Sequence, residues 1–331
     1  MSMPLCDVGT QGRAPAVEGM GVRADGVVRG KPARRFSRTG MLVLALVLSR
    51  PLLALDVPAG LTHVEVARLD PPTMTVAEAA AGLGRAMGRT PQNILTEGAS
   101  DAAFLPGAAN TSGLFNSFFT TDLFLVNPLP NTIVRLNIFA LRPNVNNSAN
   151  PPPSASVSLG PRSFTTVKNV MGQLGATGGS VLLIGIDAAN SQGSPLRFSA
   201  WAYTSTAGPS GGRYGVNIQA VGRLNQNAVV NGWNVGVNQG TATRTNFGVF
   251  NPSQSTFSVT ASIFNPGGTL VAQVPIQVPP VSFQQYALSS YASSVTDGVI
   301  VFSAASGDFG SYVVVNDNLT NDANFQLSSA W

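Results

Sequence analysis

An internal duplication is the feature that most restricts what this chain can fold into. The run Thr121-Asp-Leu-Phe-Leu-Val-Asn-Pro128 is similar to Thr245-Asn-Phe-Gly-Val-Phe-Asn-Pro252. Four further matches follow in the same order, and they pair Asn137–Phe139 with Ser262–Phe264, Leu159–Phe164 with Val278–Phe283, Val181–Ile184 with Val299–Phe302, and Asn217–Gln219 with Asn324–Gln326. A spacing of about 110 residues is too long for solenoid repeats and is typical of tandem whole domains.

Each copy has the pattern of β-structure. Short runs rich in Val, Ile, Phe and Thr alternate with clusters of Gly, Pro, Asn and Ser. In Phe257–Ile263 the odd positions are apolar and the even positions carry hydroxyls, so one face is buried and the other is wet. About seven short strands in roughly 110 residues is the number expected of an immunoglobulin-like sandwich. The sequence therefore predicts an all-β chain with two tandem antiparallel β-sandwich domains, at residues 101–222 and 223–331.

A family resemblance supports this prediction. The run Phe118–Pro128, a later Leu-x-Pro-x-Ser-Phe turn at 159–164 and a closing strand resemble paired β-sandwich modules of secreted bacterial proteins. Those modules are similar to immunoglobulin-like or fibronectin-like folds. The resemblance covers about residues 101–331 and implies an extracytoplasmic setting, but it brings no catalytic residues with it.

The first 54 residues are typical of a disordered leader with a signal peptide at residues 30–54. A cationic stretch that includes Lys31 and Arg34 precedes the apolar run Met41–Leu48, and Ala54 offers a cleavage point. Eight apolar residues are far fewer than the roughly 20 that a membrane-spanning helix needs, so we expect no transmembrane anchor in the mature chain. The alternative is a disordered basic extension. Because Cys6 is the only cysteine, the mature chain would contain no disulfide.

The net charge of +4 also comes from the leader. Of the 19 Lys and Arg residues, eight lie in the first fifty positions, and the rest of the chain holds 11 basic and 12 acidic groups. No Lys or Arg follows Arg244, so the last quarter of the chain cannot neutralise a phosphate backbone. We therefore expect no nucleic-acid partner.

The segment at 55–100 differs from the repeats because it contains one helix signal. Thr75-Val-Ala-Glu78 has the capping-box spacing, and Val76, Ala80, Leu83 and Met87 share one helical face before Pro91. We predict a short helix at residues 75–88. Gly82 and Gly84 weaken it, so this helix needs a surface to dock on.

The inventory of reactive residues argues against an enzyme. Gly208-Pro-Ser-Gly-Gly212 matches the nucleophile elbow of α/β-hydrolases, but that mechanism needs a later histidine and the only one, His63, lies upstream. Glycoside hydrolysis needs two placed carboxylates, and no glutamate follows Glu97. We read the Gly-rich run as a hairpin turn, and we expect neither a catalytic site nor a cofactor.

Two groups of residues could bind a ligand. Trp233 is the candidate ligand contact, because its Asn and Gly neighbours suggest an exposed connection, whereas Trp201 and Tyr203 share one face of a predicted strand and are expected in a core. A weak calcium site would use the loop oxygens of Asp317, Asn318 and Asp322. The alternative is that these residues only stabilise a surface turn.

These observations predict a secreted or cell-surface, non-catalytic protein with a structural or adhesive role. The alternative is a carbohydrate-binding module protein. The expected partner is a protein or glycan surface. Because the repeats nearly lack Lys, which commonly protects strand edges, self-assembly through sheet edges is a further hypothesis.

Overall fold

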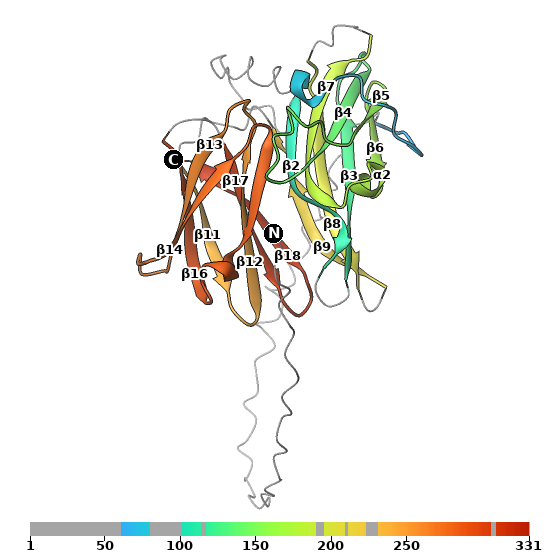
Figure 1. The fold of residues 1–331 in the computed structure, drawn as a ribbon. Helices are drawn as coiled ribbons and strands as arrows, with labels where there is room; N and C mark the ends of the chain where they lie inside the picture. The colour runs from blue at the N-terminus through green and yellow to red at the C-terminus, as the bar shows by residue number, and fades with distance from the viewer. Residues whose placement is uncertain are drawn as a thin grey trace, which may run out of the picture. The chain divides into compact units, whose positions relative to one another are not determined.

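Regular structure in this chain is almost entirely β. The computed structural model describes residues 61–79, 101–113, 117–189, 195–208, 211–222, 231–305 and 309–330 (Figure 1). Residues Val57–Trp331 form one compact unit. The predicted all-β class is confirmed. The leader with its signal peptide lies outside the described residues.

The first repeat contains two sheets that are joined through one long strand. Sheet 1a has the order β1-β6-β3-β8-β9, and sheet 1b has the order β5-β4-β7-β2-β10. The end of β2 pairs with β3 and the rest of it pairs with β7, so this strand belongs to both sheets. The strands are β1 (Thr62–His63), β2 (Ala102–Ser112), β3 (Phe118–Asn127), β4 (Val134–Leu141), β5 (Ser154–Leu159), β6 (Ser163–Val167), β7 (Gly178–Asp187), β8 (Ser199–Ala207), β9 (Arg213–Gln219) and β10 (Val221–Gly222), with helix α2 (Val170–Gln173) after β6.

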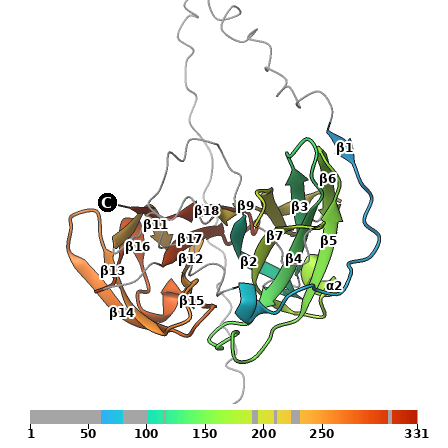
Figure 2. The ribbon, with the colours of Figure 1, turned by 90° about the horizontal axis from the view of Figure 1, so that it is seen from above.

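The second repeat also contains two sheets. Sheet 2a has the order β15-β12-β17-β18, and sheet 2b has the order β14-β13-β16-β11-β19. The strands are β11 (Asn231–Gln239), β12 (Thr243–Asn251), β13 (Phe257–Phe264), β14 (Leu270–Val278), β15 (Ser282–Ala287), β16 (Val295–Ser303), β17 (Gly310–Asp317), β18 (Ala323–Leu327) and β19 (Ser329–Ala330). In Figure 2 the two repeats can be followed by colour, green to yellow for the first and orange to red for the second.

The strand orders show that the duplication is structural. From β2 and β11 onward, each strand of the first repeat has a counterpart at the same place in the second, ending with β10 and β19. All five sequence matches fall on corresponding strands or turns. Strand pairing gives an independent residue-by-residue correspondence between the repeats. Two of the sequence matches agree with it, and three are displaced from it by one or two residues. The immunoglobulin-like likeness and the domain boundary at residue 222 remain predictions.

The ladders also fix which residues correspond in β2 and β11. Phe104 on β2 corresponds to Trp233 on β11, because each is paired with one residue on either neighbouring strand and those neighbouring strands correspond to each other. Their neighbours are Val221 and Leu182 for the first, and Ser329 and Val301 for the second. Three residues later, both strands have a bulge at a glycine with positive φ, Gly107 at 71° and Gly236 at 69°. A glycine tolerates this conformation without strain, so the bulge falls at the same point in both repeats.

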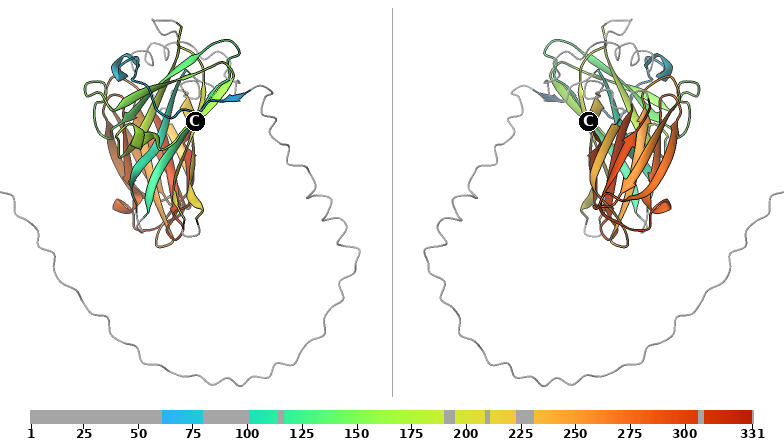
Figure 3. Two further views of the ribbon diagram at one scale, coloured as in Figure 1. Left: turned by 90° about the vertical axis from the view of Figure 1, so that its right-hand side faces the viewer. Right: turned by 90° about the vertical axis from the view of Figure 1, so that its left-hand side faces the viewer.

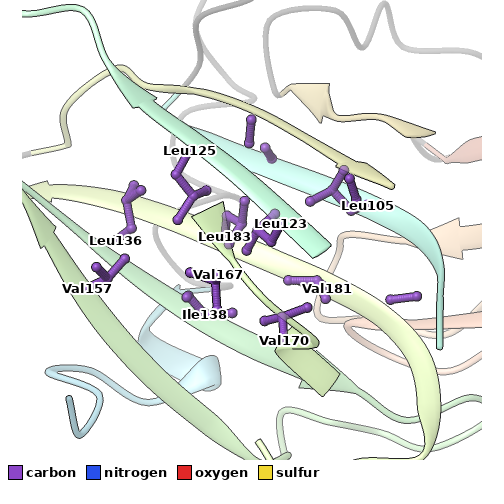
Figure 4. Close-up of a cluster of buried hydrophobic side chains, with 14 of the residues drawn as sticks. Leu105, Leu123, Leu125, Leu136, Ile138, Val157, Val167, Val170, Val181 and Leu183 are labelled. Atoms are coloured by element: carbon purple, nitrogen blue, oxygen red, sulfur yellow. The ribbon is translucent and has the colours of Figure 1, made fainter. Parts of the chain in front are cut away.

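A separate apolar core lies between the two sheets of each repeat. Leu123, Leu136 and Leu183 are fully buried in the first core, where side chains from β2, β3, β4 and β7 meet (Figure 4). Phe247, Ile263 and Phe302 are fully buried in the second. Alternate residues of each strand point inward, so the opposite faces of all four sheets point out of the repeats.

A buried asparagine ties two turns together in each repeat. The Asn127 side-chain amide donates to the carbonyls of Thr132, Leu159 and Gly160 at 2.7–3.1 Å, and its Oδ1 accepts from the Leu129 N–H. The Asn251 amide makes the same set of bonds to Ser255, Val278 and Pro279, and it accepts from the Ser253 N–H. Both side chains are at most 1% exposed. The Asn-Pro pairs therefore end β3 and β12, as proline requires, and the asparagines also hold the neighbouring turn in place.

The turn held by each asparagine contains a residue with positive φ. Arg162 has φ 46° and Val281 has φ 44°, and their backbone N–H groups donate to Leu129 and Ser253 respectively. This conformation is strained for a β-branched residue. Val281 keeps it because its side chain is 1% exposed and buried against the first repeat.

A third apolar cluster lies between the repeats, where the outer face of sheet 1b meets the outer face of sheet 2a. Phe104 stacks on Phe250, with ring centroids 3.8 Å apart and planes 11° apart. Its other buried members are Val76, Ala79, Ala102, Phe139, Leu141, Leu182, Ile184, Ile186, Val281 and Phe283. The N-terminal segment thus covers part of the same face.

The β4–β5 loop, residues 142–153, adds polar contacts to this interface. The Asn147 amide donates to the Val281 carbonyl at 2.9 Å, and the Asn144 N–H donates to the Phe283 carbonyl at 3.0 Å. The corresponding loop of the second repeat, residues 265–269, is shorter and closes on itself through a bond from the Asn265 N–H to the Thr269 carbonyl.

The predicted capping box is confirmed. The Thr75 N–H donates to Glu78 Oε2 at 2.7 Å, and the Glu78 N–H donates to Thr75 Oγ1 at 3.2 Å. The bonds from Thr75 hold the pKa of the Glu78 carboxyl below its usual value. A helix occupies residues 76–79 and buries Val76 against sheet 1b. The remainder of the predicted helix lies outside the described residues.

We predict that Asn127→Ala and Asn251→Ala each lower the free energy of unfolding by about 2–4 kcal/mol, because each leaves several buried carbonyls without a donor. Urea denaturation followed by circular dichroism measures this. Asn324→Ala, at an exposed position, should change stability by less than about 0.5 kcal/mol. Unchanged midpoints for both buried variants would contradict this account of the turns.

Candidate functional site

The outer face of sheet 1a carries an exposed aromatic platform. Phe124 on β3 lies directly opposite Trp201 on β8, and their rings are nearly parallel, 5.2 Å apart at 6°. The Trp201 side chain is 41% exposed, so the prediction that it lies in the core is wrong. Alternation placed Trp201 and Tyr203 on one face correctly, but it could not say which face of the strand is buried.

A charged cluster adjoins this platform. Asp122 Oδ2 lies 2.9 Å from Lys168 Nζ and 3.0 Å from Arg213 Nη1, while its Oδ1 accepts from the Asn169 N–H. The Arg213 guanidinium lies over the Tyr203 ring, 5.4 Å from its centroid. The carboxylate therefore links β3 to the start of α2 and to β9.

The environment of Asp122 favours its charged form. The residue is 4% exposed, and desolvation alone would raise the pKa of its carboxyl. The bonds from Lys168, the Asn169 N–H and Arg213 outweigh this effect and hold the pKa below its usual value. A carboxylate that stays ionised and has both oxygens engaged is suited to positioning strands, and poorly suited to accepting a proton in catalysis.

The outer face of sheet 2b is the second exposed surface, and Figure 3 (right) views the second repeat from this side. Trp233 lies on β11 between β16 and β19, so the prediction that it sits in an irregular connection is wrong. Its side chain is half-buried and shares a face with Val301, which lies directly opposite. Val235 and Leu270 on the same face are 49% and 47% exposed.

The calcium candidates form a hydrogen-bonded turn. Asp317 Oδ1 accepts from the N–H groups of Leu319 and Thr320, and these bonds lower the pKa of its carboxyl. Asn318 Oδ1 accepts from Arg244 Nη1 at 3.0 Å, so this oxygen is already engaged by a guanidinium. Asp322 contributes its backbone carbonyl to the Asp317 N–H. The structure thus contains the turn that was the alternative reading of these residues, and the weak calcium site stays a prediction.

The remaining sequence candidates are not assembled into a site. His63 lies on β1, where its ring is 5.0 Å from that of Phe164. Ser210 of the Gly-rich run lies outside the described residues. Within the described ranges, no group of three or more His, Cys, Asp or Glu residues lies close enough to hold a metal ion. None of the helices in the described part is long and apolar enough to cross a membrane.

The comparisons with known proteins give little. No protein-family model matches the chain, and no curated protein sequence matches it. Among solved structures, the chain is similar to Bacteroides uniformis β-glucuronidase 2 covalently bound to cyclophellitol-6-carboxylate aziridine, at 13% identity, over 70% of this chain and 26% of that chain, with a TM-score of 0.15. A second match, to Bacteroides uniformis β-glucuronidase, has 13% identity, covers 64% of this chain and 24% of the other, and has a TM-score of 0.14. The chain spans about a quarter of the length of these enzymes, and likeness at this level carries no argument about fold or activity.

We predict that Asp122→Asn lowers the free energy of unfolding at pH 7 by about 1–2 kcal/mol, a value reduced because Lys168 and Arg213 are partly exposed. Because the folded-state pKa is depressed, this contribution is complete above the unfolded pKa of 3.8 and is lost as pH falls further. Urea titrations from pH 7 to pH 2.5 should therefore show the two proteins converging below about pH 4. Asp322→Asn is the control, and an Asp122→Asn deficit that does not shrink as the pH falls below about 4 would contradict the assignment.

Proposed function

We propose that this chain is a secreted or cell-surface, non-catalytic protein that acts through surface contact in a structural or adhesive role. The observation that carries the proposal is the pair of outer sheet faces, where Trp201, Val235 and Leu270 are each more than 40% exposed. Large exposed apolar residues gathered on one face mark interaction surfaces. Two such faces on one chain suit a protein that holds other molecules together.

The hydrogen bonds and ion pairs of two carboxylates support the same proposal. Asp122 bonds two cations and a backbone N–H, while Asp317 bonds the N–H groups of its own turn. In both cases the carboxylate stabilises the fold. The extracytoplasmic setting is supported by the signal-peptide pattern at residues 30–54.

Carbohydrate binding is the second candidate, and the aromatic platform favours it. The stacked rings of Phe124 and Trp201 form an exposed apolar patch against which a sugar ring can pack. Gln219 lies directly opposite Trp201 on β9, and Thr166 lies opposite Phe124 on β6, so hydrogen-bonding groups flank the rings. Trp201 is thus a stronger candidate for ligand contact than Trp233.

A glycan array separates the two functions. Carbohydrate binding predicts a signal that Trp201→Ala abolishes and that Leu319→Ala, a control at a 91% exposed position, leaves intact. Binding to protein surfaces predicts a silent array for all three proteins. A signal that survives Trp201→Ala would contradict the assignment of the platform.

We predict that expression of the full chain in a bacterial host yields an extracytoplasmic protein whose first residue follows Ala54. The reason is that a cationic stretch followed by a short apolar run directs export and cleavage. Cell fractionation and mass spectrometry of the intact protein measure both properties. Recovery of a cytoplasmic protein with residues 1–54 intact would contradict the proposal.

A further inference from the structure

We infer that copies of this chain assemble head to tail, with the outer face of sheet 2b of one copy docked on the outer face of sheet 1a of the next. The inference rests on the proposed function and names the partner of both exposed faces as a second copy of the chain. It follows from the duplication, because the interface inside the chain uses the counterparts of the two faces that remain free.

The internal interface joins a b-type sheet to an a-type sheet. The outer face of sheet 1b supplies Phe104 and Leu182, and the outer face of sheet 2a supplies Phe250 and Phe283. Sheets 2b and 1a occupy the corresponding places in the other repeat. Each chain therefore uses one face of each kind internally and has one face of each kind left over.

The leftover face of sheet 2b retains apolar residues at two positions of its counterpart, whereas Phe139 and Ile184 of sheet 1b correspond to Ser262 and Ser303. Trp233 corresponds to Phe104, which stacks on Phe250 in the internal interface, and Val301 corresponds to Leu182. In the first repeat these positions are 2% and 5% exposed. In the second repeat both side chains are only half-buried, so these apolar side chains are open to a partner.

The leftover face of sheet 1a also carries apolar or aromatic residues at positions that correspond to those on the outer face of sheet 2a. In the ladders, Val126 corresponds to Phe250, Phe164 to Phe283, and Trp201 to Tyr312. The paired residues that fix this register are Val126 with Phe164, Phe250 with Phe283, Phe124 with Trp201, and Gly248 with Tyr312. Tyr312 is 1% exposed and Trp201 is 41% exposed, so a large ring is present in both repeats but covered only in one.

Two differences make the contact between copies weaker than the internal one. The loop at residues 142–153, which bonds Val281 and Phe283, is replaced at 265–269 by a turn too short to reach across. Arg162 stands where the internal interface has Val281. Assembly should therefore be reversible and depend on concentration.

The symmetry of the contact determines the product. A contact between two different faces of identical copies is not limited to a dimer, because a row of copies still has one free face at each of its ends. The expected product is larger than a dimer: an open chain, or a ring if the rotation between successive copies closes. Pairing of two sheet 2b faces with each other would instead stop at a dimer.

The test is analytical ultracentrifugation of the exported protein, as recovered after expression of the full chain, at increasing concentration. The weight-average mass of the wild type should rise past the dimer. Trp233→Lys on sheet 2b and Val126→Lys on sheet 1a should each weaken association at least about 100-fold, because each places an unpaired charge in an apolar contact. Leu319→Lys, outside both faces, should assemble like the wild type.

An equal mixture of the two variants gives the decisive result. The Val126→Lys copy keeps an intact sheet 2b and the Trp233→Lys copy keeps an intact sheet 1a, so together they should form one junction and stop at a dimer. Val235→Lys, at a 49% exposed position, replaces Trp233→Lys if that variant unfolds.

A wild type that stays monomeric would overturn the inference, as would dimers of Val126→Lys alone or a mixture that remains monomeric. If the monomeric wild type binds glycans or another protein through Trp233, that ligand is the occupant of the face and the inference also fails. In those cases the proposed function stands, since it is tested separately by export and by binding.

Discussion

The apolar layer between the repeats determines the rest of this architecture. Phe104 and Phe250 stack at its centre, and burial of each such side chain stabilises the native state by about 1.5–3 kcal/mol. Because the layer joins sheet 1b to sheet 2a, it decides which two of the four outer faces remain exposed. The strain at Val281 and the docking of residues 76–79 both depend on the same layer.

The strand pattern was predictable because it depends on local chemistry. Alternation in Phe257–Ile263, the proline after Asn127 and the pair Thr75 and Glu78 each act within a few residues, and the structure shows each as expected. β11 was missed because its sequence is rich in Asn and Gly, residues that are depleted in strands, and tertiary pairing with β16 overrides that preference. The bonds of the Asn127 amide span up to 33 residues and leave no local signal.

The candidate surfaces were harder to predict because they depend on which faces are covered. Trp201 and Tyr312 occupy corresponding places, and the sequence around each is typical of a strand. In the structure Tyr312 is 1% exposed, whereas Trp201 is 41% exposed. The role of Asp317 was easier to predict, because Asp commonly stabilises a turn by bonding its own backbone, and that alternative followed from the sequence.

The central claim is that one copy of a duplicated face is buried between the repeats while its counterpart is open. Hydroxyl-radical footprinting of the dilute, monomeric chain, read by mass spectrometry, measures this at the level of single side chains. Trp201 and Trp233 should be oxidised, whereas Tyr312 and Phe250 should be protected until the protein unfolds. Equal oxidation of Trp201 and Tyr312 in the native state would contradict the account.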